Sequence, residues 1–148
     1  MLKFAAAALA CCLSFSAMAA EGLVVKPSNH SVSDTIDRLQ NVLEEKGLTI
    51  FARVDHQAGA AGADLELRPT ELLIFGNPKL GTPLMTGAQT TAIDLPQKAL
   101  AYEDESGNVF LAYNDVGYLM ARHDIKDRDE VLGKIRGALD NFTNAATK

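Results

Sequence analysis

The sequence has no tryptophan and only two cysteines, Cys11 and Cys12, both of which lie close to the N-terminus. If this N-terminal segment is removed, the remaining chain contains no thiol. A protein of an oxidising compartment carries either paired cysteines or none. The lack of cysteine in the mature chain therefore excludes disulfides, thiolate nucleophiles, zinc–thiolate sites and iron–sulfur clusters.

The chain also lacks an excess of basic over acidic residues. The chain has 14 lysines and arginines against 19 aspartates and glutamates, a formal net charge of −5. Loss of Lys3 with the N-terminal segment leaves 13 basic and 19 acidic residues, a net charge of −6. Such a chain lacks the positive patch that neutralises phosphates or docks on anionic lipids. We therefore expect no nucleic-acid partner and no electrostatic membrane contact.

Long hydrophobic runs are absent except at the start, where the pattern is typical of a signal peptide. Lys3 supplies a positive charge, residues 4–15 are almost wholly apolar, and Ala17-Met18-Ala19 is a small-x-small cleavage site. The apolar run is too short to span a bilayer. We predict a signal peptide over residues 1–20, cleavage near Ala19 or Ala20, and a periplasmic or secreted protein without a membrane span.

The remaining composition is that of an ordinary globular domain. Apolar residues make up 47% of the chain and charged residues 22%. About 128 mature residues suffice for one domain with a core of its own. We predict a single domain over residues 21–148.

Two long amphipathic helices are predicted. Ser31 and Asp34 are typical of a helix start, and Gly47 is the expected residue beyond the end. A second helix is expected after Asp127-Arg-Asp-Glu130, which resembles a capping box. Apolar residues recur at helical spacing in both segments: Val32, Ile36, Leu39 and Leu43 in the first, and Val131, Ile135, Leu139 and Phe142 in the second.

Five strands are expected. Residues 22–26 form a short one that Pro27 ends, and residues 48–54 alternate, with Leu48, Ile50, Ala52 and Val54 predicted to face the core. Residues 72–75 are continuously apolar, which favours a strand buried on both faces. Residues 98–103 and 109–113 flank a turn at 104–108 and predict a hairpin whose strand ending at Tyr113 is an exposed edge.

Shorter segments complete the pattern. Asn77-Pro78 begins a short helix, and residues 115–123 suit another. The small residues 58–63 are interpreted as a loop or short helix, with a mobile flap as the alternative. Helices beside strands joined mainly by hairpin-type connections predict an α+β layer architecture.

Four segments resemble a known family, the domain-of-unknown-function family numbered 302: residues 67–79, 81–85, 94–96 and 113–115. The resemblance extends from about Gly22 to the C-terminus. It implies a TATA-box-binding-protein-like fold of strand, helix, four antiparallel strands and helix, with the helices on one face of the sheet. It also implies frequent dimerisation and frequent export, and no established activity.

The chain departs from this family at two positions. Many relatives carry a cysteine before Asn-Pro and another after Leu-Pro, where this sequence has Gly76 and Gln97. Thiol chemistry of such relatives cannot transfer to this chain.

Motifs for catalysis are lacking. Residues 76–82 resemble a phosphate loop only superficially, because Lys79 lies inside the loop and Thr82 occupies the place of the lysine. The backbone at Asn77-Pro78 favours an anionic group only as any helix start does. The sequence contains no Gly-x-Ser-x-Gly, no His-x3-His and no His-Glu-x-x-His motif.

We therefore expect an exported, non-catalytic module that binds a small apolar or amphiphilic molecule or a protein partner. A homodimer whose sheets pair is a separate hypothesis. No catalytic residue, cofactor or metal ligand is assigned. The candidate ligand-binding residues are His56, Arg68, Asn77, Thr82 and His123. The alternative is a metal-binding protein or metal-assisted hydrolase centred on His56 and His123, each of which has a neighbouring aspartate.

Overall fold

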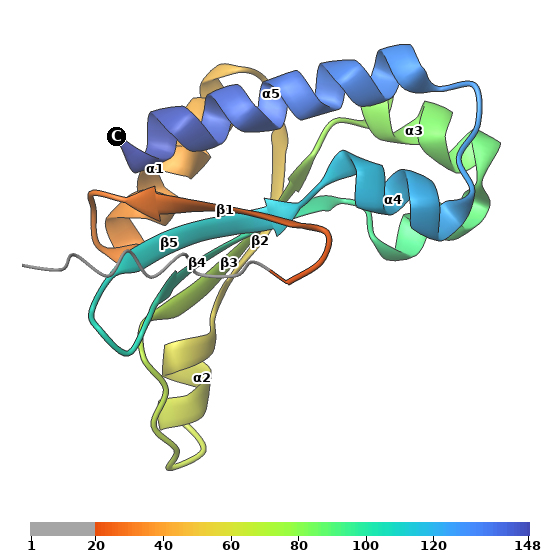
Figure 1. Ribbon diagram of the computed structural model, residues 1–148. Coiled ribbons are helices and arrows are strands. Elements are labelled where there is room, and N and C mark those ends of the chain that lie inside the picture. The colour runs from red at the N-terminus through yellow and green to blue at the C-terminus, as the bar shows by residue number, and fades with distance from the viewer. Residues whose placement is uncertain (1–19) are drawn as a thin grey trace, which may run out of the picture.

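The computed structural model describes residues 20–148 (Figure 1). The predicted signal peptide, apart from Ala20, and both cysteines lie outside the described residues. Export therefore stays a prediction.

The fold is built on a five-stranded sheet in the order β1-β5-β4-β3-β2, and every neighbouring pair is antiparallel. Its strands are β1 (Leu23–Ser28), β2 (Thr49–Asp55), β3 (Thr70–Gly76), β4 (Gln97–Glu103) and β5 (Val109–Asn114). The predicted edge is wrong, because β5, which carries Tyr113, lies between β1 and β4. The edges are β1 and β2.

Helices α1 and α5 pack side by side on one face of this sheet (Figure 1). The helices are α1 (Val32–Glu45), α2 (His56–Ala61), α3 (Pro78–Gly87), α4 (Val116–His123) and α5 (Asp129–Thr147), with a 3₁₀ helix η1 (Gln89–Ile93) after α3. The predicted α+β class, strand order along the chain and single helical layer are confirmed.

The core lies between the sheet and these two helices. Because directly opposed residues of antiparallel strands point to the same face, the register selects one row of inward side chains. The buried core comprises Leu73, Phe75, Ala99, Ala101, Leu111 and Tyr113 from the sheet, Ile36, Leu39 and Leu43 from α1, and Leu132, Ile135 and Leu139 from α5.

A bulge in β2 overturns the predicted alternation of that strand. The register shifts between Ile50 and Ala52, which adds one residue to β2 relative to β3. Beyond the bulge Arg53 lies opposite Leu73 on the helix-covered face, where its guanidinium pairs with Asp37 of α1. Ala52 and Val54, predicted to face the core, therefore point to the other face.

The other face of the sheet, here called the outer face, is apolar and partly exposed. It carries Leu72, Ile74, Leu100, Tyr102, Phe110 and Ala112. The rings of Tyr102 and Phe110 stack at 5.6 Å. Leu72 and Ile74 remain partly exposed, so the prediction that residues 72–75 are buried on both faces is wrong.

Two predicted boundaries are also wrong. Pro27 lies within β1 opposite Phe110, which an edge strand tolerates because one side of it needs no N–H donor. Helix α5 begins after Arg128 without a side-chain cap, so residues 127–130 form no capping box.

The other predicted starts and turns are confirmed. Ser31 accepts a hydrogen bond from the Asp34 amide at the start of α1, and Gly47 has a φ of +73°. In the hairpin turn, the Asp104 carboxylate accepts hydrogen bonds from the amides of Ser106 and Asn108, each at 2.8 Å. Hydrogen bonding, chiefly from the Asn108 side chain, lowers the pKa of Asp104.

Helix α5 is attached at both ends. Near its C-terminus, Arg38 of α1 donates to the carbonyls of Ala145 and Ala146, and Lys26 of β1 pairs with Asp140 at 2.6 Å. Just before its first residue, Arg128 donates to the carbonyl of Pro83 in α3 at 3.2 Å. The helix thus bridges α1 and α3.

Candidate functional site

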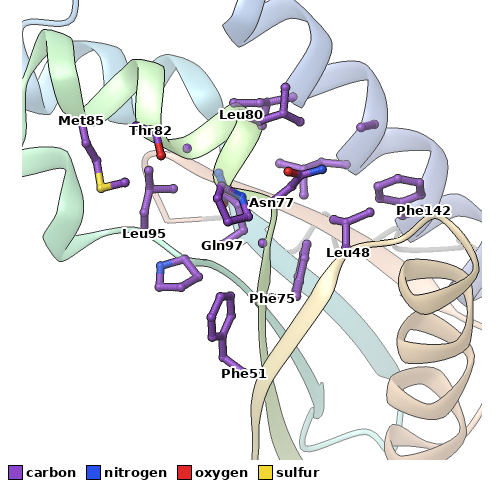
Figure 2. Close-up of a pocket in the computed structure, with 17 residues that line it drawn as sticks. Leu48, Phe51, Phe75, Asn77, Leu80, Thr82, Met85, Leu95, Gln97 and Phe142 are labelled. Atoms are coloured by element: carbon purple, nitrogen blue, oxygen red, sulfur yellow. The ribbon is translucent and has the colours of Figure 1, made fainter.

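A cavity of about 250 Å³ lies where β3 and β4 meet α3 and α5 (Figure 2). It lies beneath the part of α5 between its two attachments. Its lining comprises Leu48, Phe51, Phe75, Gly76, Asn77, Pro78, Leu80, Gly81, Thr82, Met85, Leu95, Pro96, Gln97, Ile135, Ala138, Leu139 and Phe142.

The Asn77-Pro78 corner opens this space. The Asn77 side-chain oxygen accepts from the Lys79 amide at 2.9 Å, and Pro78 occupies the first turn of α3. Both features favour a helix start here. Because the chain changes from strand to helix at this point, α3 leaves the plane of the sheet. The cavity lies between α3, the end of β3 and α5.

The lining is almost wholly apolar and carries no charged side chain. Phe75 forms part of the buried core at its base, whereas Phe51, on the bulge of β2, lies at the rim with 55% of its surface exposed. Polar side chains are contributed only by Asn77, Thr82 and Gln97. Such a site favours an apolar molecule with few polar atoms.

Gln97 is the unusual member of this lining. The residue is only 9% exposed, and its Nε2 is the one buried side-chain nitrogen or oxygen within residues 20–148 that has no hydrogen-bond partner. Burying an amide without a partner costs free energy.

Of the five candidate residues, the structure brings Asn77 and Thr82 together at the cavity. Arg68 instead lines a separate hollow beside α2, and its Nε donates to the Glu103 carbonyl at 3.2 Å. His56 is the exposed first residue of α2. Figure 1 shows α2 at the opposite end of the sheet from α4, which carries His123. The two histidines therefore do not share a site.

His123 joins η1 to α4 through a compact polar cluster. Its Nε2 lies 2.6 Å from Asp94 Oδ2 and its Nδ1 lies 3.0 Å from Thr90 Oγ1. Asp94 also lies 3.4 Å from Arg122. The hydroxyl–imidazole–carboxylate order matches that of a hydrolase triad, but Thr90 does not line the cavity. The arrangement is best explained as a clamp between two short helices.

A metal centre finds no support in this part of the chain. Among residues 20–148, no group of three or more His, Cys, Asp or Glu side chains is placed to hold a metal ion. The run of small residues 58–63 lies largely in the exposed helix α2, as one of the two interpretations predicted.

Sequence reasoning missed most of the lining. The alternation of residues 48–54 places Phe51 on the face away from the core and so indicates an exposed aromatic side chain. The bulge that places this side chain at the rim of the cavity has no sequence signature. Gly76 and Gln97, the two departures from the family pattern, both line the cavity. That coincidence was the strongest signal available in the sequence.

Comparison with known proteins identifies the fold and the family. The family described as "Domain of unknown function DUF302" matches residues 24–142. The crystal structure of a DUF302 protein from Bacillus stearothermophilus superposes with a TM-score of 0.76 at 16% identity, covering 86% of this chain and 99% of that chain.

Curated relatives with higher identity carry a different name. The "Fluoride-specific ion channel FluC 1" proteins of Brucella suis and Brucella abortus are 51% identical over 127 residues, which cover 86% of this chain but only 49% and 46% of those proteins. The chain thus spans about half the length of these relatives. In residues 20–148, none of the helices has the length and apolarity needed to cross a membrane.

Replacement of His123 by alanine is expected to lower the free energy of unfolding by about 1–3 kcal/mol, because the partly buried Asp94 carboxylate loses its short hydrogen bond and keeps only the longer contact with Arg122. Chemical denaturation measures the change. His56→Ala is the matched control and should change stability by less than about 0.5 kcal/mol, since His56 is exposed. Equal losses for both variants would contradict the clamp.

Proposed function

The chain belongs to the DUF302 family, and from its cavity we propose that it is a non-catalytic module that binds one small apolar molecule between α3, α5 and the sheet. The observation that carries this proposal is a cavity of about 250 Å³ whose lining is uncharged and almost wholly apolar. Cavities of this character in folded proteins are the usual sites of small-molecule binding.

The size of the cavity limits the ligand. An apolar cavity of about 150 Å³ accommodates benzene. The larger space here therefore suits a molecule of about ten carbon atoms by the same comparison. The part of the ligand that the cavity encloses is smaller than a nucleotide or a long lipid chain.

The lining supports binding rather than turnover. Proton transfer and nucleophilic attack require groups such as histidine, carboxylate, lysine or an activated hydroxyl. Among the lining residues only Thr82 offers a hydroxyl, and no histidine, carboxylate or lysine lines the cavity beside it.

The named relatives favour a second role, and we propose that the module assists a fluoride channel. This chain matches about half of proteins named fluoride-specific ion channels at 51% identity. Two parts joined in one chain stay at high local concentration, so a separate copy of one part is a candidate partner of the other. Fluoride itself is not the expected ligand of the cavity, because an anion there would lose its hydration without a counter-charge.

The outer face supports homodimerisation. Two acidic molecules repel each other, but this face carries no acidic residue on β3, β4 or β5. Its one charged residue on these strands is Lys98, which lies opposite Ile74 and whose ammonium is already bound by the carbonyls of Asp94 and Pro96. A largely apolar surface of this kind suits an isologous contact with a second copy.

Indane, a neutral hydrocarbon of suitable size, is expected to bind with 1:1 stoichiometry and to raise the melting temperature. The variant Gly81→Leu should abolish binding without unfolding the protein, because a Cβ at Gly81 lies 3.7 Å from Leu95 and 4.0 Å from Met85, in ordinary contact. The control Gly133→Leu, in open space on α5, should bind normally. Titration calorimetry measures both, and equal affinities in the two variants would refute this binding site.

Deletion of the gene in the source organism is expected to lower the highest sodium fluoride concentration that permits growth. Sodium chloride at equal concentration is the control, and the intact gene on a plasmid should restore tolerance. Unchanged fluoride tolerance in the deletion strain would contradict a role beside the channel.

The wild-type protein is expected to elute as a dimer, and Leu100→Glu as a folded monomer, because a carboxylate on the outer face cannot be buried against a second copy. Light scattering coupled to gel filtration determines the mass. Ile93→Glu, which replaces a strongly exposed apolar residue on η1, is the control and should remain dimeric. A monomeric wild type, or a dimeric Leu100→Glu, would contradict this interface.

A further inference from the structure

The unpaired amide of Gln97 indicates what kind of molecule the cavity selects. Gln97 begins β4, where its backbone lies opposite Phe75. Its Nε2 is fully buried and has no hydrogen-bond partner among the described residues. Nearly all buried polar atoms in folded proteins have a partner, so an exception on the lining of a cavity needs an explanation.

A role in stabilising the fold does not explain the unpaired amide. The side chain lines the cavity together with Phe75, Leu95 and Asn77 (Figure 2). A leucine or methionine of similar size would fill the same place without burying an unpaired amide. The amide is therefore available to a ligand, and because the last torsion of a glutamine side chain is broad and roughly two-fold, it can turn its N–H toward the cavity.

The other polar groups are less suited to this role. Asn77 is only partly buried, and its side-chain oxygen accepts the Lys79 amide, which fixes the orientation of its own amide nitrogen. Thr82 is exposed and lies toward solvent. Gln97 thus supplies the most deeply buried hydrogen-bonding group of the lining.

The charge of the ligand is also constrained. No lysine, arginine or histidine lines the cavity. The adjacent Lys98 is held by two backbone carbonyls and is not part of the lining. A carboxylate or ammonium placed inside would lose its hydration without a compensating charge.

We infer that the cavity selects an uncharged, compact apolar molecule with a single hydrogen-bonding oxygen, which accepts the N–H of Gln97. Ketones and aldehydes of about ten carbon atoms are the class that fits this chemistry and the comparison of cavity volumes. This inference rests on the proposed function and names the ligand class of the same site.

The test compares two ligands of one shape, indane and 1-indanone, which differ by one carbonyl oxygen. The ratio of their dissociation constants is measured by calorimetry for the wild type, for Gln97→Leu and for the control Gln89→Leu, whose exposed glutamine lies outside the cavity. Taking the ratio within each protein cancels the cost of dehydrating the ketone, as in a double-mutant cycle.

The preference for 1-indanone over indane should fall by about three- to tenfold in Gln97→Leu, which corresponds to one neutral hydrogen bond. Indane should bind this variant as tightly as it binds the wild type or more so, which also shows that the variant is folded. Gln89→Leu should keep the wild-type ratio. Indane-1-carboxylate should bind the wild type at least about tenfold more weakly than 1-indanone because its charge is unpaired in the cavity.

Two failures are distinguishable. If neither indane nor 1-indanone binds the wild type, the proposed function itself is wrong. If indane binds but the ratio is the same in the wild type and in Gln97→Leu, or if the carboxylate binds as tightly as the ketone, the cavity binds ligands but the assigned ligand class is wrong.

Discussion

The attachment of α5 at its two ends determines where this molecule is hollow. Arg38 and Lys26 fix the C-terminal part to α1 and β1, and Arg128 fixes the start to α3. Between these points Ile135 and Leu139 complete the core on the side of the sheet while also lining the cavity. The helix runs from β1 and α1 to α3, and the space between α3, the sheet and this part of α5 is left as the cavity. Interiors are otherwise packed closely.

The sequence predicted the elements better than their mutual arrangement. Helical spacing, the Ser31 cap and the hairpin around Asp104 are local features, and local features determine where helices and turns form. The class of fold and its single helical layer followed from these together with the family resemblance. The strands at the edges of the sheet could not be predicted from such local features, because β1 pairs with β5, which is far away in the sequence.

The candidate site could be predicted only in part, for a related reason. Asn77 was found because a strand-to-helix corner has a sequence signature. Phe51 and Gln97 reach the cavity through a register shift and a strand pairing that no local pattern records. His56 and His123 look alike in sequence, each beside an aspartate, yet the partner of His123 is the distant Asp94. Chemical partnership in space does not follow from neighbourhood in sequence.

The two borders of the sheet have a consequence for how the protein behaves when concentrated. Pro27 removes one N–H donor from the outer strand β1, and the bulge interrupts the ladder of the outer strand β2. Both features hinder another chain from pairing with the sheet as a sixth strand, which is the step by which sheets grow into fibrils. Both edges are therefore poor templates for growth of the sheet along its hydrogen-bonding direction.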